Sequence, residues 1–139
     1  MKTFLLLFLA MFTAVSCRDR NEYLQPAYFS FMVNINEPSF FDLSVPTGWV
    51  YYNGNNVNLI IYRNDLEVFH VFDARSTYNP TDPCNCEVAS DNVTIQDPCS
   101  GSKWLLSDGF LLEGPATFNL LEYDYDFDLT TGNLYLFSQ

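Results

Sequence analysis

The sequence consists of short runs of β-branched and aromatic residues, and no segment shows a sustained helical period. Turn-forming residues separate these runs, for example at 53–56 and 131–133. Many short strands punctuated by turns indicate an all-β sandwich or a partly closed barrel. We expect strands at 28–36, 49–53, 57–63, 67–73, 93–96, 117–128 and 133–137.

The run 123–128 alternates strictly between aromatic and acidic residues. Successive side chains of a strand point to opposite faces of the sheet, so the aromatic side chains and the carboxylates are predicted to lie on opposite sides. We interpret the run as a half-buried strand with a solvated acidic face. Carboxylates on one face of a strand do not wrap a calcium ion.

The amino-terminal residues have the pattern of an export signal. Lys2 precedes an apolar run at 4–14, and the last residue of this run begins the sequence AVSC at 14–17. The apolar run is too short to span a bilayer, which needs about 20 residues. Residues 1–16 are therefore predicted to be a secretory signal peptide.

The AVSC sequence resembles a bacterial lipobox, which implies that Cys17 is acylated and becomes the first mature residue. Ordinary signal cleavage that leaves Cys17 as a stray thiol is the alternative. The residues that follow are polar and lack an apolar period. We therefore expect a signal peptide at 1–16, a tether at 17–27 and one β domain at 28–139.

The predicted mature chain is strongly acidic. Removal of residues 1–16 takes away Lys2 and no acidic residue, which leaves 5 Lys+Arg against 17 Asp+Glu and a formal charge of −12. Nucleic-acid recognition depends on basic side chains that meet phosphates, so the composition speaks against a nucleic-acid partner. It also disfavours direct adhesion to anionic lipid headgroups.

Residues 99–104 (CSGSKW) and 112–116 (LEGPA) form the most specific pattern in the chain. The pattern resembles the second cluster-binding loop of a Rieske iron–sulfur domain, followed by the Gly-Pro loop of that family. The runs 60–62 and 69–74 resemble the strand pair that leads into the first cluster loop. The resemblance covers about residues 28–139. It implies a Rieske-like antiparallel β-sandwich or partly closed barrel with two former cluster-binding loops.

The resemblance also implies that the cluster ligands are absent. A Rieske centre is held by two cysteines and two histidines. Aligning the Gly-Ser pair of the second loop with that of the family places four other residues at the former ligand positions, namely Ser76, Tyr78, Asp97 and Ser100. None of these offers the sulfur or imidazole donor of a Rieske centre. We therefore expect no cofactor.

Four family loop residues are retained, namely Gly101, Ser102, Gly114 and Pro115. In cluster-bearing relatives, the serine donates a hydrogen bond to a cluster sulfur and the Gly-Pro loop shields the cluster from water. These residues also have structural roles, since a Gly-Pro pair fixes a tight bend. Their retention supports the fold more than the activity.

Many Rieske domains have a disulfide between the first loop and the middle cysteine of the second loop. Cys99 takes that second position, and Cys84 or Cys86 lies in the first loop. The resemblance therefore implies either Cys84–Cys99 or Cys86–Cys99, with the third cysteine left as a thiol, and the sequence does not choose between them. An unusual [2Fe–2S] cluster on these three cysteines and Asp97 is the alternative, although such clusters usually have four cysteine ligands.

The single histidine, His70, lies inside an apolar run and is expected to be a partly buried strand residue with one hydrogen-bonded nitrogen. The chain contains no Ser-His-acid set with a spare histidine, no phosphate-binding glycine loop and no metal motif of histidine and carboxylate. We therefore expect a protein that is not an enzyme.

Three functions from different classes are compatible with these features. The first is an envelope lipoprotein, held in the bilayer by acylated Cys17, whose metal-free domain binds an envelope protein or glycan or has a structural role. The outer membrane is the favoured location. The second is an electron carrier with an unusual [2Fe–2S] cluster. The third is a thiol–disulfide role for Cys84, Cys86 and Cys99, without the Cys-x-x-Cys helix start that lowers a thiol pKa.

Overall fold

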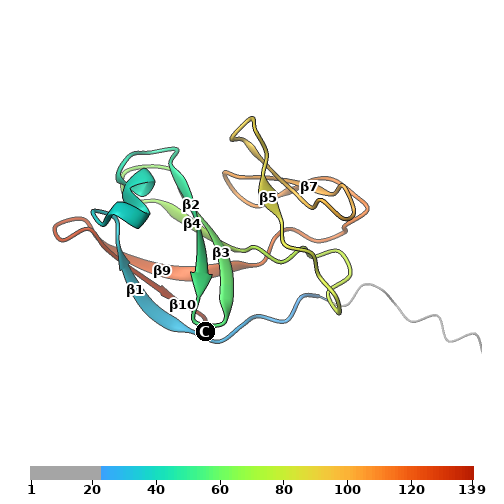
Figure 1. Cartoon of the computed structure of the whole chain (residues 1–139), viewed down its shortest axis with the longest axis horizontal. Helices are drawn as coiled ribbons and strands as arrows, with labels where there is room; N and C mark the ends of the chain where they lie inside the picture. The colour runs from blue at the N-terminus through green and yellow to red at the C-terminus, as the bar shows by residue number, and fades with distance from the viewer. Residues whose placement is uncertain (1–22) are drawn as a thin grey trace, which may run out of the picture.

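The computed structural model describes residues 23–139, which form two antiparallel β-sheets and one short 3-10 helix (Figure 1). The larger sheet has the strand order β1-β10-β9-β4-β3-β2, and the smaller sheet has the order β5-β6-β7-β8. The predicted all-β architecture is confirmed. The elements are β1 Ser30–Asn34, η1 Pro38–Ser44, β2 Trp49–Gly54, β3 Val57–Arg63, β4 Phe69–Asp73, β5 Glu87–Val88, β6 Thr94–Gln96, β7 Lys103–Leu105, β8 Leu111–Glu113, β9 Glu122–Asp128 and β10 Asn133–Phe137.

The larger sheet curls until aromatic rings join its two edge strands. Phe31 of β1 stacks on Tyr52 of β2 with ring centroids 4.5 Å apart and planes inclined by 21°. Phe40 of η1 stacks on the same tyrosine ring at 6.3 Å. Stacked aromatic pairs of this kind stabilise by about 0.5–1.5 kcal/mol beyond the area they bury. Side chains thus connect the two edges of a partly closed barrel.

Strand β3 is buried on both faces because it lies between two hydrophobic cores. Leu59 and Ile61 belong to the core inside the curled sheet, whereas Ile60 and Tyr62 belong to the core beneath the smaller sheet. Alternate strand side chains point to opposite faces, so a strand covered on both sides needs a continuous apolar run. This explains the unbroken burial of 59–63.

Hydrogen bonds from β2 help to hold the smaller sheet against the larger one. The Trp49 indole donates to Asn92 Oδ1 at 3.0 Å, and the Tyr51 hydroxyl accepts the Val88 amide at 2.6 Å. Trp104 of β7 is fully buried in the core between the two sheets. These contacts therefore attach the smaller sheet and its loops to the larger sheet.

The aromatic and acidic residues of β9 separate as the sequence predicts. Tyr123 is buried, and Tyr125 and Phe127 are half-buried, while the intervening aspartates are exposed. The predicted strand at 117–128, however, begins only at Glu122. The backbone before it bonds elsewhere, since the Leu120 amide donates to Gly109 and the Leu121 carbonyl accepts the Asp73 amide.

Three short strands, β5, β7 and β8, were not among the predicted runs. Each has only two or three residues, which is too few to show an alternating pattern. Pairing with neighbouring strands defines these elements, so they arise from tertiary context.

The segment 23–27 packs on the β domain, although the sequence placed it in the tether 17–27. Leu24 is 1% exposed and belongs to the core of the curled sheet. The backbone of this segment accepts a hydrogen bond from Arg75 and donates one to the Tyr123 hydroxyl. Burial of an apolar side chain and pairing of the backbone stabilise the docked arrangement. Packing on the β domain therefore includes residues 24–27, which the sequence placed in the tether.

The predicted signal peptide and the predicted acylation site at Cys17 lie outside the described residues. Within 23–139, no helix has the length and apolarity required to cross a membrane.

Candidate functional site

Two loops of the smaller sheet meet at one corner of the molecule. The first loop (74–86) connects β4 to β5, and the second loop (97–102) connects β6 to β7. A disulfide between Cys84 and Cys99 joins them, with Cα atoms 6.3 Å apart. This is one of the two pairings that the sequence left open. Cys86 is a free, buried thiol.

Backbone hydrogen bonds close the first loop at its base. The Ser76 amide donates to the Cys84 carbonyl at 2.7 Å, and the Cys86 amide donates to the Ala74 carbonyl at 2.6 Å. Arg75 and Asn85 form an antiparallel bridge between these bonds. The two ends of the loop are thus fixed side by side, which places Ser76 next to the second loop.

A buried carboxylate connects the two loops. Asp97 is 1% exposed, and its Oδ2 accepts hydrogen bonds from the Ser76 hydroxyl at 2.7 Å and the Ser100 hydroxyl at 2.6 Å. Its Oδ1 accepts the Cys99 amide at 2.8 Å. Burial by itself raises the pKa of Asp97, but these hydrogen bonds stabilise the charged form and the net pKa lies below the usual value. The carboxylate is therefore ionised at neutral pH.

The second loop is a tight turn around this carboxylate. The Gly101 amide donates to the Asp97 carbonyl at 2.8 Å, and the Asp97 amide donates to the Ser102 carbonyl at 2.9 Å. Gly101 has a φ of +79°, a conformation that glycine adopts without steric cost. The turn also places the hydroxyl oxygens of Ser100 and Ser102 2.9 Å apart.

The Gly-Pro loop (114–121), between β8 and β9, lies against the second loop. The Ala116 amide donates to the Ser102 hydroxyl at 2.9 Å, which gives this retained serine a structural role. Gly114 and Pro115 are exposed beside that contact. The Phe118 carbonyl accepts hydrogen bonds from the Trp104 indole and from the first loop. Three segments of the chain are therefore fixed to one another at this corner.

The structure thus brings together three of the four predicted ligand positions. Ser76, Asp97 and Ser100 form one hydrogen-bonded group. Tyr78 joins this group only through its backbone amide, which donates to the Ser76 hydroxyl at 3.1 Å. Its half-buried ring packs on the core beneath the smaller sheet. The phenol therefore contributes to packing.

Cys86 lies close to the same group. Burial raises the pKa of its thiol to about 12, with a smaller contribution from the negative charge of Asp97. A hydrogen bond with Ser76 acts in the opposite direction. The thiolate is the nucleophilic form of cysteine, so this side chain is protonated and unreactive at neutral pH. A thiol–disulfide exchange role for Cys86 is therefore disfavoured.

A second buried polar network, which the sequence analysis missed, lies behind the first loop. Asp73 is 2% exposed, and it accepts hydrogen bonds from the Arg75 guanidinium and the Tyr123 hydroxyl. The hydrogen bond with Asp73 raises the pKa of Arg75. The pKa of Tyr123 is raised to about 12, mainly by burial and secondly by its hydrogen bond to Asp73. The sequence signal for this network is Asp-x-Arg at the end of an apolar strand, where Asp73 is the last residue of β4.

His70 lies on β4 and is 19% exposed in its side chain. Its Nδ1 is 2.7 Å from Glu122 Oε1, and its ring stacks on Phe72. This matches the expected partly buried strand histidine with one hydrogen-bonded nitrogen. The side chain has a local structural role on the sheet.

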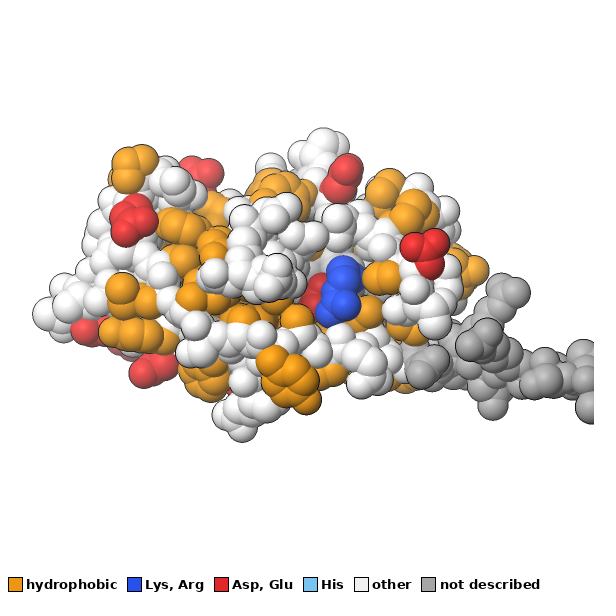
Figure 2. Space-filling view, turned by 60° about the horizontal axis from the view of Figure 1, so that its bottom comes forward, with side chains coloured by type: hydrophobic (Ala, Val, Ile, Leu, Met, Phe, Trp, Pro, Cys, Tyr) orange, Lys and Arg blue, Asp and Glu red, His pale blue; other side chains and the backbone are white. Residues whose placement is uncertain are grey.

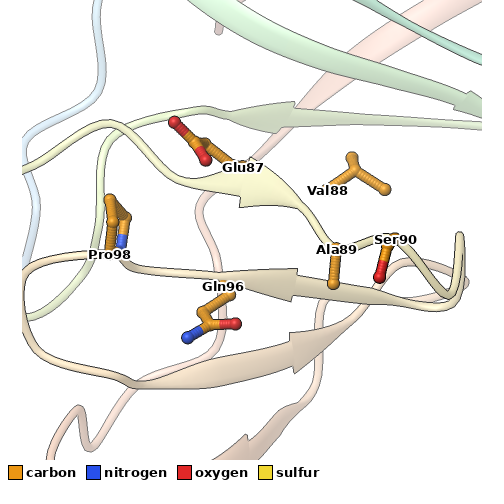
Figure 3. A pocket seen from close by; sticks show the side chains of 6 residues that line it. All are labelled: Glu87, Val88, Ala89, Ser90, Gln96 and Pro98. Atoms are coloured by element: carbon orange, nitrogen blue, oxygen red, sulfur yellow. The ribbon is translucent and has the colours of Figure 1, made fainter.

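A shallow hollow borders the second loop. Its lining residues come from β5, the turn after β5, β6 and the second loop, namely Glu87, Val88, Ala89, Ser90, Gln96 and Pro98 (Figure 3). Glu87 is its one charged residue, and it pairs in register with Gln96. The hollow therefore lacks a converging set of catalytic groups.

No protein-family model and no curated protein matches this sequence. Among solved structures, the chain is similar to the cyanobacterial plasma membrane Rieske protein PetC3 from Synechocystis PCC 6803. The TM-score is 0.56 at 18% identity, over 75% of this chain and 97% of that one. It is also similar to a chain in the complex of reduced oxygenase and oxidized ferredoxin in carbazole 1,9a-dioxygenase, with a TM-score of 0.52 at 16% identity, over 81% and 96%. These likenesses establish a Rieske-like fold.

The fold raises the question of whether these loops fit a Rieske cluster, which needs two thiolates and two imidazoles. The junction of the loops offers serine hydroxyls and the Asp97 carboxylate, and the sulfurs of Cys84 and Cys99 are bonded to each other. His70 is the only histidine in the chain. This set of donors does not fit a Rieske cluster.

Proposed function

We propose that this protein is a membrane-anchored envelope lipoprotein whose Rieske-like domain has lost its iron ligands and acts as a non-enzymatic binding or structural module. The observation that carries the proposal is the hydrogen-bonded group at the junction of the two loops. Ser76 and Ser100 both donate to Asp97, and the Cys84–Cys99 disulfide holds the loops together. Covalent and hydrogen-bonded ties thus take the place of ties through a metal cluster.

The disulfide stabilises the folded domain mainly by reducing the conformational entropy of the unfolded chain. The two cysteines are 15 positions apart in the sequence. In the chain-entropy description, a loop of this size stabilises the folded state by about 3 kcal/mol. A domain without a cluster can therefore keep its two loops ordered.

The position of the amino-terminal segment supports a short connection to the membrane. Leu24, near the start of the described residues, is already packed, so at most residues 18–23 separate the proposed lipid on Cys17 from the β domain. An extended chain spans at most about 3.3–3.6 Å per residue, so such a link would keep the domain within roughly 20 Å of its anchor. One of the similar structures is itself a plasma membrane Rieske protein.

Exposed apolar side chains supply the contact surface for the proposed envelope protein or glycan. They occur in groups across the face seen in Figure 2, together with scattered acidic side chains. Tyr28 is 82% exposed, and Phe110 and Leu112 beside the Gly-Pro loop are also exposed. Aromatic side chains provide large contact areas at low entropic cost, which suits a binding module.

Iron and sulfide reconstitution tests the proposal. The chain carrying Cys17→Ser is incubated anaerobically with iron, sulfide and a thiol reductant, and its iron content and visible absorption are recorded. We expect no stoichiometric iron and no charge-transfer bands. A coloured protein with two irons and two sulfides per chain would overturn the metal-free assignment.

Lipid attachment is tested separately. Cells that express the full chain or its Cys17→Ser variant are grown with labelled palmitate, and their membranes are fractionated. We expect label and membrane retention only for the unchanged chain. Retention of both by the variant would contradict the proposed anchor.

An electron carrier with an unusual [2Fe–2S] cluster is the second candidate, and one observation favours it. Ligand atoms of Cys84, Asp97 and Cys99 all lie within 4.8 Å of one another. One of the similar structures contains a ferredoxin. The reconstitution experiment decides between the two functions, because only the carrier would take up iron and sulfide together.

A further inference from the structure

We propose that reduction of the Cys84–Cys99 disulfide creates a site for a single Zn²⁺ ion, with the sulfurs of Cys84 and Cys99 and the carboxylate of Asp97 as ligands. The proposal concerns a mononuclear metal site that is controlled by the redox state of the disulfide. It holds independently of the lipid anchor and of the module's partner.

The Asp97 carboxylate lies beside the disulfide that joins Cys84 to Cys99. Within residues 23–139, this is the one place where at least three side chains with metal-ligand atoms come together, all within 4.8 Å of one another. In a tetrahedral zinc site with Zn–S bonds of about 2.3 Å and Zn–O bonds of about 2.0 Å, the ligand atoms are roughly 3.3–3.8 Å apart. Small side-chain rotations therefore suffice once the sulfurs separate.

Two thiolates and a carboxylate are donors that suit Zn²⁺. Zn²⁺ accepts thiolate and carboxylate ligands in tetrahedral sites and requires no histidine. Asp97 Oδ2 accepts hydrogen bonds from two serine hydroxyls, and Oδ1 accepts the Cys99 amide. A metal ion bound at Oδ1 would share that oxygen with the Cys99 amide.

The protein already holds the Asp97 carboxylate in place. The hydroxyls of Ser76 and Ser100 and the Cys99 amide fix its orientation from three directions. Partners of this kind outside the ligand set orient ligands and strengthen metal binding. A preorganised ligand also loses little conformational entropy when the metal ion binds.

Solvent reaches the Cys84–Cys99 disulfide. Cys99 is exposed and Cys84 is half-buried, while Asp97 closes the inner side. A reductant and a metal ion can therefore approach from outside, and a water molecule can occupy the fourth position. The metal ion would then tie together the same two loops that the disulfide ties in the oxidised protein.

The redox step is a simple exchange. A dithiol reductant supplies two electrons and two protons to the Cys84–Cys99 bond, which yields two thiols, and the reductant becomes a cyclic disulfide. Zn²⁺ binding then releases the two thiol protons to water. Metal affinity should consequently rise with pH, because the thiolates are the ligands.

Metal titration tests the proposal on the full chain carrying Cys17→Ser. The oxidised and the reduced protein are titrated anaerobically with Co²⁺ and then with Zn²⁺, followed by absorption spectroscopy and near-UV circular dichroism. We expect one Co²⁺ per chain in the reduced protein, with sulfur-to-metal and tetrahedral ligand-field bands that Zn²⁺ abolishes. We expect no binding to the oxidised protein.

Three variants separate the proposed ligands from their neighbours. Cys86→Ala should keep the site, since Cys86 is not among the three converging groups. Ser100→Ala, which keeps all ligands but removes one hydrogen bond, should weaken binding by about 10- to 100-fold. Asp97→Asn should weaken it further, with circular dichroism as the check on folding.

Several results would overturn the zinc site. One is that the reduced protein takes up no stoichiometric metal, whether or not reduction leaves it folded. Another is that the oxidised protein binds metal equally well. A third is that Cys86→Ala loses metal binding. Assembly of an iron–sulfur cluster would instead overturn the proposed function, so failures of the two proposals can be told apart.

Discussion

The Ser76 hydroxyl lies 2.7 Å from Asp97 Oδ2, and through this hydrogen bond the first loop contacts the second at a fully buried point. The two residues are 21 positions apart in the chain. A buried carboxylate is costly unless it is hydrogen-bonded. The stability of this corner therefore depends on Asp97 and its donors.

Asp97→Asn should destabilise the folded protein by about 1–3 kcal/mol, because the amide cannot accept every hydrogen bond that the carboxylate accepts. Urea unfolding at pH 7 measures the effect. Asp124→Asn, at an exposed position of β9, is the matched control and should change the free energy of unfolding little. Equal effects of the two variants would contradict the role of Asp97.

The pH dependence of stability should also change in Asp97→Asn. The folded pKa of Asp97 is lowered, so between that value and the unfolded value of about 3.9 the unfolded chain binds a proton that the folded chain does not. The contribution of Asp97 to the free energy of unfolding therefore rises with pH across this interval. That contribution is lost on acidification below about pH 4. The variant should show a shallower loss than the unchanged protein.

The thiol of Cys86 should be unreactive in the folded protein. It is 2% exposed, and burial raises its pKa to about 12. In the chain carrying Cys17→Ser, we expect no reaction with a thiol reagent under native conditions and one thiol after denaturation. Three thiols without added reductant would show that the Cys84–Cys99 disulfide is absent in solution.

Tyr123→Phe should destabilise the protein by about 1–2 kcal/mol, because the hydroxyl pairs two groups at once. It donates to Asp73 at 2.7 Å and accepts the Ala27 amide at 2.9 Å. Hydrogen exchange should show faster opening of the segment 23–27. Tyr135→Phe, at a half-exposed position of β10, serves as the control, with a change within about 0.5 kcal/mol.

Arg63→Met should destabilise the protein strongly, by about 3 kcal/mol or more, because it leaves one buried and two partly buried carbonyls without their donor. Arg63 is 3% exposed, and its guanidinium donates to the carbonyls of Leu43 and Ser44 at 2.9 Å and to that of Leu66. It also lies over the Phe69 ring at 5.3 Å. Thermal unfolding and proteolysis near η1 would measure the loss.

Lys103→Met is the matched control for Arg63→Met. Its ion pair with Glu113 at 3.3 Å is half-exposed, and such surface pairs contribute little. If the two methionine variants had the same stability, the buried guanidinium would not be the structural tie that we describe.

Much of the fold was predictable because local patterns carry it. Alternation predicted the two faces of β9, and the apolar run at 57–63 predicted the strand β3. The strands β5, β7 and β8 were missed because two or three residues cannot show a period. Leu24 was missed because a single apolar residue in a polar segment gives no periodic signal.

The candidate site divides in the same way. The resemblance of the loops placed Asp97 and Ser100 in one short motif, which local spacing can show. Contact of that motif with Ser76, and the contact between Asp73 and Tyr123, join residues that are distant in sequence. Such contacts depend on how the sheets pack.

The sequence by itself determined the class of the fold and the chemistry of its donors, because side-chain types and their alternation are local properties. The resemblance of its loops to those of Rieske domains implied two possible disulfide pairings. Only the tertiary structure decided that Cys84 bonds to Cys99, that Cys86 is buried and that Asp97 is enclosed by serine hydroxyls. The reason is geometric: sheet pairing sets which loop positions approach within bonding distance, and burial then determines which groups ionise or react.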